Sequence, residues 1–273
     1  MFNNQCWWIT GASSGIGEAL AKALSNQGAS LILSGRNVAA LEAVAKECSD
    51  TLILPFEVTD FDQIETLTEQ AWEWKGRIDG LINNAGISQR SLAIDTAFEV
   101  YQQMIDVDLL APIALTQAVL PKMVNAGGGH IVAISSVAGI AGVPMRSAYC
   151  AAKHGLIGYH DSVRAENEHL GIQVHVIAPG SVKTNVSINA LTADGAKRGV
   201  SDAAIDNGMS PSDSAKAILD AIIEGKRELI LATGMELEIA HLRRRDPDAL
   251  FDATSNMVRQ GYAKTMNSET DKN

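Results

Sequence analysis

The sequence predicts an α/β fold in which helices cover both faces of a seven-stranded parallel sheet, a three-layer, doubly wound arrangement. Three observations predict it. Seven short apolar runs alternate with longer amphipathic runs, a glycine-rich turn follows the first apolar run, and no change of composition divides the chain. Strands that alternate with helices form βαβ units, whose strands run parallel and are buried on both faces.

The individual elements follow from the local pattern of apolar residues. Strands are expected at Cys6–Thr10, Leu31–Ser34, Thr51–Pro55, Gly80–Asn83, His130–Ser135, Gln173–Ala178 and Glu228–Leu231. Helices are expected at Ile16–Gln27, Val38–Cys48, Asp60–Trp74, Val100–Asn125, Ser147–Leu170 and Ser212–Glu224. Turn residues support these limits, because Ser210-Pro211-Ser212-Asp213 has the order of a helix cap, a first-turn proline and an acidic third residue.

No linker interrupts the chain, so we expect residues 1–273 to form a single dinucleotide-binding domain. Residues 185–210 have little apolar periodicity and are long for a connection, which predicts a substrate lid. Residues 233–273 are expected to form a helical C-terminal extension of two short helices, split at Asp246-Pro247, with residues 268–273 disordered.

Composition and charge exclude several classes of function. The chain has 22 Lys and Arg against 32 Asp and Glu, a formal net charge of −10, which disfavours nucleic acid or an anionic membrane as the main partner. No apolar run approaches the roughly 18 to 20 residues of a membrane helix. The start lacks the basic segment of a signal peptide, and the three cysteines form no CxxC pair. We therefore expect a cytoplasmic protein with neither nucleic-acid nor membrane partner, and no histidine or cysteine pattern indicates a metal site.

The glycine-rich turn, Thr-Gly-Ala-Ser-Ser-Gly-Ile-Gly from Thr10 to Gly17, lies between the first strand and the first helix. Glycines let the backbone approach a pyrophosphate, and the helix N-terminus offers free N–H groups and the positive end of a dipole. This context predicts a Rossmann-type dinucleotide site, the alternative being a plain tight turn.

The end of the second strand bears on the choice of dinucleotide. NAD-binding proteins usually carry an acidic residue there, which holds the ribose 2′-hydroxyl. This sequence has Arg36, whose guanidinium can pair with a 2′-phosphate, so NADP(H) is favoured over NAD(H). The alternative is that Arg36 is merely a solvated residue at the start of a helix.

Tyr149 and Lys153 lie four residues apart at the start of a predicted helix and therefore share a face. A free phenol, with a pKa of about 10, is a poor base near neutrality. A neighbouring ammonium favours the phenolate and makes the hydroxyl a usable proton donor and acceptor. Ser136 ends the preceding strand, where its hydroxyl could bind a substrate oxygen or simply cap the strand end.

With these motifs the chain resembles the short-chain dehydrogenase/reductase family from about residue 5 to residue 232. The shared features are TGxxxGxG at Thr10 to Gly17, Asn-Asn-Ala-Gly at residues 83–86, Ser136, YxxxK at Tyr149 and Lys153, and Pro179-Gly180 followed by Thr184. Within the family, the segment after Pro-Gly and the tail loosely resemble the dehydrogenase/reductase member 7 branch and its bacterial relatives.

The resemblance implies Tyr149 as general acid/base, Ser136 as ligand of the substrate oxygen, and Lys153 on the nicotinamide ribose. It further implies that hydride passes between the cofactor and a carbonyl or secondary alcohol. The implied cofactor-binding residues are Gly11, Ser13, Ser14, Gly15, Ile16, Gly17, Arg36, Asn37, Glu57, Val58, Asn84, Ala85, Gly86, Tyr149, Lys153, Pro179, Gly180, Val182 and Thr184.

Two residues depart from the family pattern. Asp108 stands where the family usually has an asparagine that positions a water for proton relay to the lysine. Asp108 could act through its main-chain carbonyl, or its charge could alter the balance between Tyr149 and Lys153. Glu57 replaces the aspartate that accepts a hydrogen bond from the adenine amino group, and its longer side chain can still do so.

The expected activity is NADP(H)-dependent hydride transfer to or from a mainly apolar carbonyl or alcohol substrate. Its pocket would be bounded by Ile87, Val137, Val143, Met145, Ser181 and residues 186–209. The alternatives are a 3-oxoacyl-carrier-protein reductase-like activity and a non-catalytic NADP(H)-sensing binding protein. The resemblance also implies a homodimer or homotetramer formed through the long helices that carry Asp108 and Tyr149.

Overall fold

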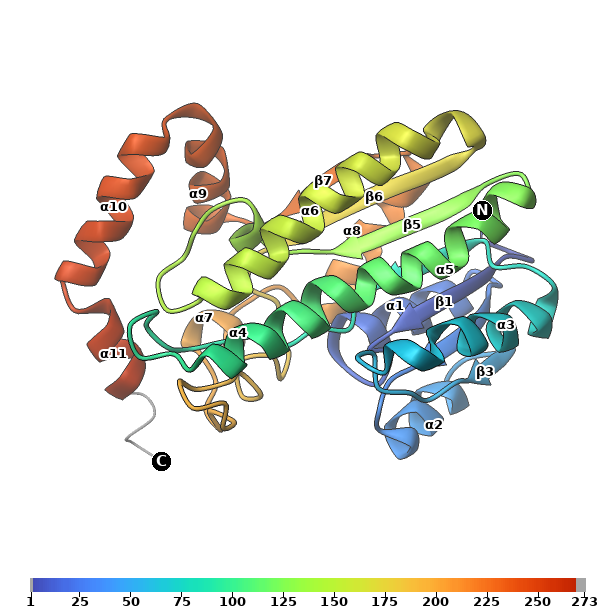
Figure 1. Cartoon of the computed structure of the whole chain (residues 1–273), viewed down its shortest axis with the longest axis horizontal. Helices are drawn as coiled ribbons and strands as arrows, with labels where there is room; N and C mark the ends of the chain where they lie inside the picture. Colours follow the sequence, from blue (N-terminus) through green and yellow to red (C-terminus); the bar gives the residue numbers. More distant parts are fainter. Residues whose placement is uncertain (1, 269–273) are drawn as a thin grey trace.

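The computed structural model describes residues 2–268 and confirms the seven-stranded parallel sheet of a Rossmann fold (Figure 1). Its strands lie in the order β3-β2-β1-β4-β5-β6-β7, and every paired register is parallel. The strands are β1 (Cys6–Thr10), β2 (Ser30–Ser34), β3 (Thr51–Ile53), β4 (Gly80–Asn83), β5 (Gly129–Ile134), β6 (Ile172–Pro179) and β7 (Glu228–Leu231).

The helices follow the strands in sequence and pack on both faces of the sheet (Figure 1). The α-helices are α1 (Gly15–Ser25), α2 (Val38–Lys46), α3 (Ile64–Lys75), α4 (Phe98–Ile105), α5 (Ala111–Asn125), α6 (Ser147–Asn167), α7 (Ala203–Asp206), α8 (Pro211–Ile223), α9 (Gly234–Arg245), α10 (Pro247–Arg259) and α11 (Tyr262–Ser268). Short helices of other types are η1 (Phe61–Gln63), the π-helical turn η2 (Asp106–Leu110), η3 (Val137–Gly139) and η4 (Glu168–Leu170).

Alternate side chains of β1 supply the two halves of the core, because successive side chains of a strand point to opposite faces. Trp7 and Ile9 pack in a cluster with residues of α1, α2 and α8. Trp8 packs on the other face with residues of α3 and α5. The buried Trp8 Nε1 donates to Ser34 Oγ at 2.8 Å, so its only polar atom is satisfied within the core.

The helix from Phe98 to Asn125 is continuous, since η2 joins α4 to α5 without a break. This corrects the expectation that no segment is long and apolar enough to span a membrane: an 18-residue window of this 28-residue helix passes by length and composition, with mean hydropathy 1.4. The reason is that Pro112, in the first turn of α5, and Pro121 are both accommodated in the helix. Within the protein, 44% of that window is buried.

The order of the strands determines where a ligand can bind. The chain moves outward from β1 through β2 to β3, then returns to the other side of β1 with β4. At such a reversal the loops at the carboxyl ends of the two central strands diverge and leave a crevice between them. The glycine-rich turn follows β1, and Asn84-Ala85-Gly86 follows β4, so both flank this crevice.

The segments after β6 and β7 differ in part from the sequence-based expectation. Residues 185–210 contain the short helix α7, and the predicted cap of α8 is confirmed, because Ser210 Oγ accepts the Asp213 N–H at 3.0 Å. Helices α9 and α10 meet at Asp246-Pro247, but a third helix, α11, follows and ends at Ser268. The remainder of the segment expected to be disordered, 269–273, lies outside the described residues.

Candidate active site

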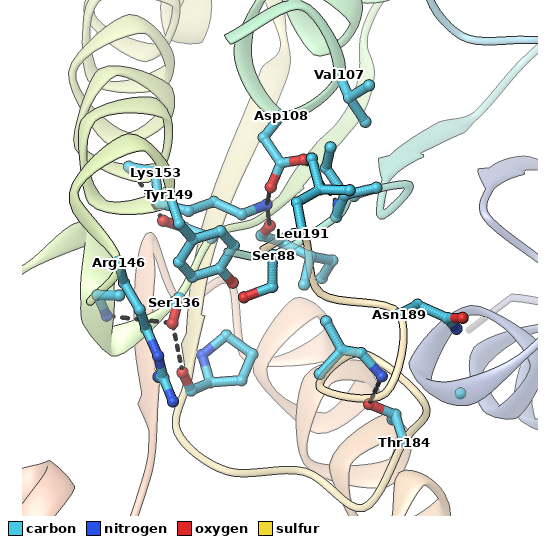
Figure 2. Close-up of a pocket in the computed structure, with 18 of the residues that line it drawn as sticks. Ser88, Val107, Asp108, Ser136, Arg146, Tyr149, Lys153, Thr184, Asn189 and Leu191 are labelled. Carbon is cyan, nitrogen blue, oxygen red and sulfur yellow. Dashed lines mark hydrogen bonds and ion pairs between the residues drawn. The ribbon is translucent and has the colours of Figure 1, made fainter. Parts of the chain in front are cut away.

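A cavity of about 1090 Å³ opens at the carboxyl ends of the central strands (Figure 2). The loops after β1, β2, β3, β4, β5 and β6 line it, together with parts of residues 185–205 and of helices α4, η2, α6, α9, α10 and α11. Every residue predicted for the site lines this cavity except Gly17. The structure therefore brings together residues that lie up to 173 positions apart in the chain, from Gly11 to Thr184.

The glycine-rich turn has the geometry of an anion cradle. Gly11 and Gly15 have φ angles of +64° and +60°, which residues with a Cβ rarely adopt. A Cβ on Gly11 would also lie 2.9 Å from the Ala85 Cα. Ser14 is the N-cap of α1 and makes no side-chain cap hydrogen bond, so the first N–H groups of the helix have no side-chain cap. These features fit the pyrophosphate of a dinucleotide.

Gly17, predicted to be a cofactor-binding residue, does not itself line the cavity but packs against the turn. A Cβ there would collide with the Gly11 carbonyl oxygen and with Asn84 Nδ2. Asn84 Nδ2 donates to the carbonyl oxygens of Thr10 and Gly11, at 2.9 and 3.2 Å. The absence of a side chain at Gly17 thus lets α1 approach the turn closely, while the Asn84 amide ties the turn to β4.

Arg36 and Glu57 meet at the far end of the cavity, where an adenosine would lie. Arg36 Nη1 is 3.2 Å from Glu57 Oε2, and both side chains are substantially exposed. The adjacent Asn37 caps α2, since its side chain accepts the Ala40 N–H at 3.1 Å. The structure therefore pairs the residue predicted for a 2′-phosphate with the one predicted for adenine.

Tyr149 and Lys153 project from the first turns of α6 into the cavity (Figure 2). Lys153 Nζ lies 5.6 Å from the centroid of the Tyr149 ring and donates to the Ile134 carbonyl oxygen at 3.0 Å. Ser136 lies after β5, where its Oγ accepts the Ala138 N–H at 3.1 Å and donates to the Pro179 carbonyl oxygen at 3.3 Å. Ser136, from the segment after β5, and Tyr149 and Lys153, from α6, thus line one wall of the cavity.

Asp108 is fully buried in the π-helical turn and reaches the same wall. Its Oδ1 accepts the Ile87 N–H at 2.8 Å, and its Oδ2 lies 3.2 Å from Lys153 Nζ (Figure 2). Burial raises the pKa of the Asp108 carboxyl, although the Lys153 charge opposes this. Burial alone would lower the pKa of the Lys153 ammonium, but the negative charges of Asp108 and Tyr149 leave it raised. Lys153 therefore stays an ammonium, paired with Asp108.

Four of the residues expected to bound the substrate pocket line the cavity: Ile87, Val137, Val143 and Ser181. Met145 does not line it, which corrects the expectation for that residue. Met145 has a φ angle of +64° and a side chain only 5% exposed, and its carbonyl oxygen accepts the Ser91 N–H at 3.1 Å. This strained backbone turns the Met145 side chain into the protein.

Sequence reasoning missed a buried group of charged residues at this end of the cavity. Asp202 forms ion pairs with three arginines, Arg90, Arg146 and Arg198. We call these four residues the arginine cluster. Only Arg198 and Asp202, four residues apart, carry a signal in the sequence, because the others come from distant segments. Also missed were the cavity-lining residues of the C-terminal helices, Met235, Glu236, Ile239, Thr254, Met257 and Tyr262.

A dinucleotide cradle beside a serine, a tyrosine and a lysine defines a class: nicotinamide-dependent oxidoreductases on a Rossmann fold. The family described as short chain dehydrogenase matches residues 5–194, and the chain belongs to the short-chain dehydrogenase/reductase family. Members of this family are oxidoreductases that bind a nicotinamide cofactor, act on small-molecule substrates and are typically oligomeric.

Similar proteins confirm the resemblance within the family. The chain is 38% identical over 266 residues to dehydrogenase/reductase SDR family member 7B of Danio rerio, covering 94% of this chain and 86% of that protein. It is 43% identical over 196 residues to dehydrogenase/reductase SDR family member 7 of Homo sapiens, covering 68% and 58%.

Solved structures share the fold. A short-chain dehydrogenase from Streptomyces avermitilis has a TM-score of 0.76 at 28% identity, covering 94% of this chain and 98% of that one. A short-chain dehydrogenase/reductase from Burkholderia phymatum, in complex with NAD, has a TM-score of 0.80 at 22% identity, covering 91% and 95%. The second likeness bears on the fold alone.

Proposed function

We propose that the protein is an NADP(H)-dependent oxidoreductase that transfers hydride to or from a carbonyl or secondary alcohol, with Tyr149 as general acid/base. The observation that carries this proposal is the position of Ser136, Tyr149 and Lys153 on one wall of the cavity that also contains the glycine-rich turn. A proton donor and an anion cradle in one continuous cavity are what reduction of a carbonyl by a nicotinamide requires.

The cofactor would be held along the length of the cavity. The backbone of Gly11 to Ile16 would hold the pyrophosphate, and Arg36 with Glu57 would hold the adenosine end. Pro179 to Thr184 would contact the nicotinamide end, where Thr184 lies against Gly15. When bound, the nicotinamide supplies or accepts a hydride.

The chain's own residues would manage the proton. In the reducing direction, Ser136 Oγ would turn from the Pro179 carbonyl oxygen, its present acceptor, to donate to the substrate oxygen. The Tyr149 hydroxyl would then give its proton to that oxygen. The phenolate that remains would be stabilised by the Lys153 ammonium, 5.6 Å from the ring centroid. Oxidation would run the same transfers in reverse.

The preference for NADP(H) is supported by Arg36 at the end of β2. Its side chain is 71% exposed and lines the cavity, so its guanidinium can reach a 2′-phosphate of a bound cofactor. Exposed ion pairs contribute little free energy, about 0 to 1 kcal/mol, so a dianionic phosphate can displace Glu57 from the guanidinium. Replacing Arg36 by alanine should therefore weaken NADPH binding and leave NADH binding nearly unchanged.

Residues 185–210 are proposed to form a substrate lid, because they contribute Val186, Asn189 and Leu191 to the cavity wall. With Ile87 and Val137 opposite, this wall favours a mainly apolar substrate. A homodimer or homotetramer through α4, α5 and α6 is also proposed, since Leu110 on this surface is 40% exposed. A cytoplasmic location remains a prediction.

The test measures oxidation of NADPH and of NADH with a panel of ketones and aldehydes, together with the Tyr149→Phe variant. We expect NADPH to be used at least tenfold better by kcat/KM, and Tyr149→Phe to lose at least 10²-fold in kcat while still binding NADPH. Binding of NADPH without turnover of any carbonyl would support the cofactor-sensing alternative instead. Tighter binding of NADH than of NADPH would refute the role of Arg36.

A further inference from the structure

Two members of the arginine cluster, Arg90 and Arg146, line the cavity. Most of the hydrogen-bonding capacity of the cluster is used between its own members. Asp202 Oδ2 accepts from Arg90 Nε at 2.8 Å and from Arg90 Nη2 at 2.5 Å. Asp202 Oδ1 accepts from Arg198 Nη1. These three side chains are each 3% exposed, so the carboxylate is largely saturated by buried partners.

Arg146 is the member of the cluster that is left incompletely bonded. Its Nη2 lies 3.5 Å from Asp202 Oδ2, at the limit of a hydrogen bond, and that oxygen already accepts twice from Arg90. Its Nε is buried and has no hydrogen-bond partner among the described residues. A buried donor without an acceptor costs about 1 to 3 kcal/mol in general, and a charged one more, so such groups call for a partner.

The charges of the arginine cluster do not cancel. Arg90 and Arg146 line the cavity, and together with Arg198 they outnumber the single carboxylate of Asp202. Acidic residues line other parts of the same cavity, among them Glu236 of α9, whose carboxylate accepts the Ser181 N–H and the Ser181 hydroxyl, both at 2.8 Å. Burial, together with the positive charge of Arg146, lowers the pKa of Arg90 to about 10. The arginine cluster itself therefore carries an excess of positive charge.

We propose that Arg146 binds an anionic group of the substrate, a carboxylate or a phosphate, close to the carbonyl that Tyr149 protonates. Arg146 precedes α6 directly and lies three residues before Tyr149, and both line the cavity with Ser136 (Figure 2). The planar guanidinium fits two oxygens of such a group, and a change of the Arg146 rotamer would let the buried Nε take part in that contact. The inference rests on the proposed function and refines it: the substrate is apolar along Val137 and Val143 but anionic at one end.

The experiment compares three matched ketones with NADPH as reductant: a 3-oxo carboxylate, its methyl ester, and the phosphate monoester of a hydroxyketone of similar length. In the wild type, kcat/KM for at least one anionic ketone should exceed that for the ester by tenfold or more. Which anion is preferred distinguishes a carboxylate site from a phosphate site. In Arg146→Gln, kcat/KM for that anionic ketone should differ from kcat/KM for the ester by no more than about threefold. The rate with the ester should be nearly unchanged.

Two further variants separate a specific contact from a general effect of charge or folding. Lys46→Gln removes an exposed cation of α2 that does not line the cavity, and it should keep the wild-type ratio. Arg146→Lys keeps the positive charge but loses the planar guanidinium that can contact two oxygens at once. Its ratio of kcat/KM for the anionic ketone to that for the ester should lie between those of Arg146→Gln and the wild type. An anion-to-ester ratio that is the same in Arg146→Gln as in the wild type would overturn the proposal.

Failure of the proposed function has a different signature. If no ketone is reduced, the proposed oxidoreductase activity is wrong, and calorimetric binding of the 3-oxo carboxylate and the phosphate monoester then decides the role of Arg146. At least tenfold weaker binding of one of them to Arg146→Gln, with unchanged circular dichroism, supports the anion site. Equal affinities of both proteins for both anions refute it.

Discussion

At the scale of single residues, Asp108 illustrates what the sequence leaves open. The sequence allowed two roles, one through the main-chain carbonyl and one through the charge of the side chain. The structure places the carboxylate 3.2 Å from Lys153 Nζ, with its other oxygen held by the Ile87 N–H. The charge thus acts directly on the lysine that would support Tyr149. This contact depends on the π-helical turn, which no local pattern in residues 106–110 indicates.

Replacing Asp108 by asparagine should shift the pH dependence of alcohol oxidation to lower pH. The Asp108 charge opposes formation of a nearby phenolate, and it also raises the pKa of Lys153. Removing one buried negative charge beside Lys153 should move the midpoint of the kcat–pH profile down by about one unit. The profile is measured from pH 5 to 10 with a secondary alcohol and NADP⁺.

Asp106→Asn is the matched control for this prediction, because Asp106 lies on the same π-helical turn, lines the cavity and has no ion pair to Lys153 among the described contacts. Its midpoint should stay within about 0.3 units of the wild type. An unshifted profile in Asp108→Asn would mean that the carboxylate is not felt at the proton-transfer step.

At the scale of elements, the glycine-rich turn and α1 were predictable, and their neighbours explain why. The apolar strand, the turn and the helix cap are all local signals, so β1 agrees with its predicted limits and α1 begins one residue before the predicted Ile16. A side chain at Gly17 would collide with the Gly11 carbonyl oxygen and with the amide of Asn84, 67 positions away. Local spacing identified the motif, but it could not indicate the contact with Asn84, and the part of Gly17 in cofactor binding stays a prediction.

Gly17→Ala should weaken cofactor binding although Gly17 does not line the cavity. The new methyl group would push α1 away from Gly11 and break the bonds of the Asn84 amide to the turn. We expect the Kd for NADPH to rise at least tenfold and the free energy of unfolding to fall by about 1 to 3 kcal/mol. Fluorescence titration of NADPH and urea unfolding provide the two measurements.

Gly158→Ala, in the middle of α6, serves as the comparison, because a Cβ there meets no atom within 4 Å. That variant should keep its NADPH affinity and gain about 0.5 to 1 kcal/mol from its higher helix propensity. Equal NADPH affinities for Gly17→Ala and the wild type would show that close packing of α1 on the turn is not required.

The elements after β6 were the least predictable. Residues 185–210 and the C-terminal helices owe their conformation to distant partners, such as the Arg90–Asp202 pair, which spans 112 positions, and the Arg198 bond to the Met266 carbonyl oxygen at 3.1 Å. Weak periodicity correctly indicated that 185–210 is not a regular helix or strand. It could not indicate that buried charges hold this segment in place, nor that α11 exists.

At the scale of the whole molecule, buried histidines make stability depend on pH. Burial lowers the pKa of His130 and of His160 to about 4 each, from 6.5 for a free imidazole. The native state holds both neutral, whereas the unfolded chain protonates them below pH 6.5. The contribution of the two histidines to the free energy of unfolding is therefore complete above pH 6.5 and is lost as the pH falls toward 4.

The free energy of unfolding should accordingly decrease between pH 6.5 and pH 4, with a slope of up to about 1.4 kcal/mol per pH unit from each histidine. Urea unfolding followed by circular dichroism at half-unit steps measures it. A His160→Gln variant should show a shallower slope over this window. A stability that is constant from pH 6.5 to 4 would contradict burial of neutral imidazoles.

The position of β1 has a practical consequence for studying the whole molecule. Trp7 and Trp8 are completely buried on opposite faces of the central strand, one in each half of the core. Because an indole emits at shorter wavelength in an apolar surrounding than in water, two adjacent chromophores report on two different layers. The chain has two further tryptophans, Trp72 and Trp74 of α3. With both of these replaced by phenylalanine, replacing either Trp7 or Trp8 in the same way would leave one indole as the probe of one layer, so the layer that loosens first on denaturation can be identified without any label.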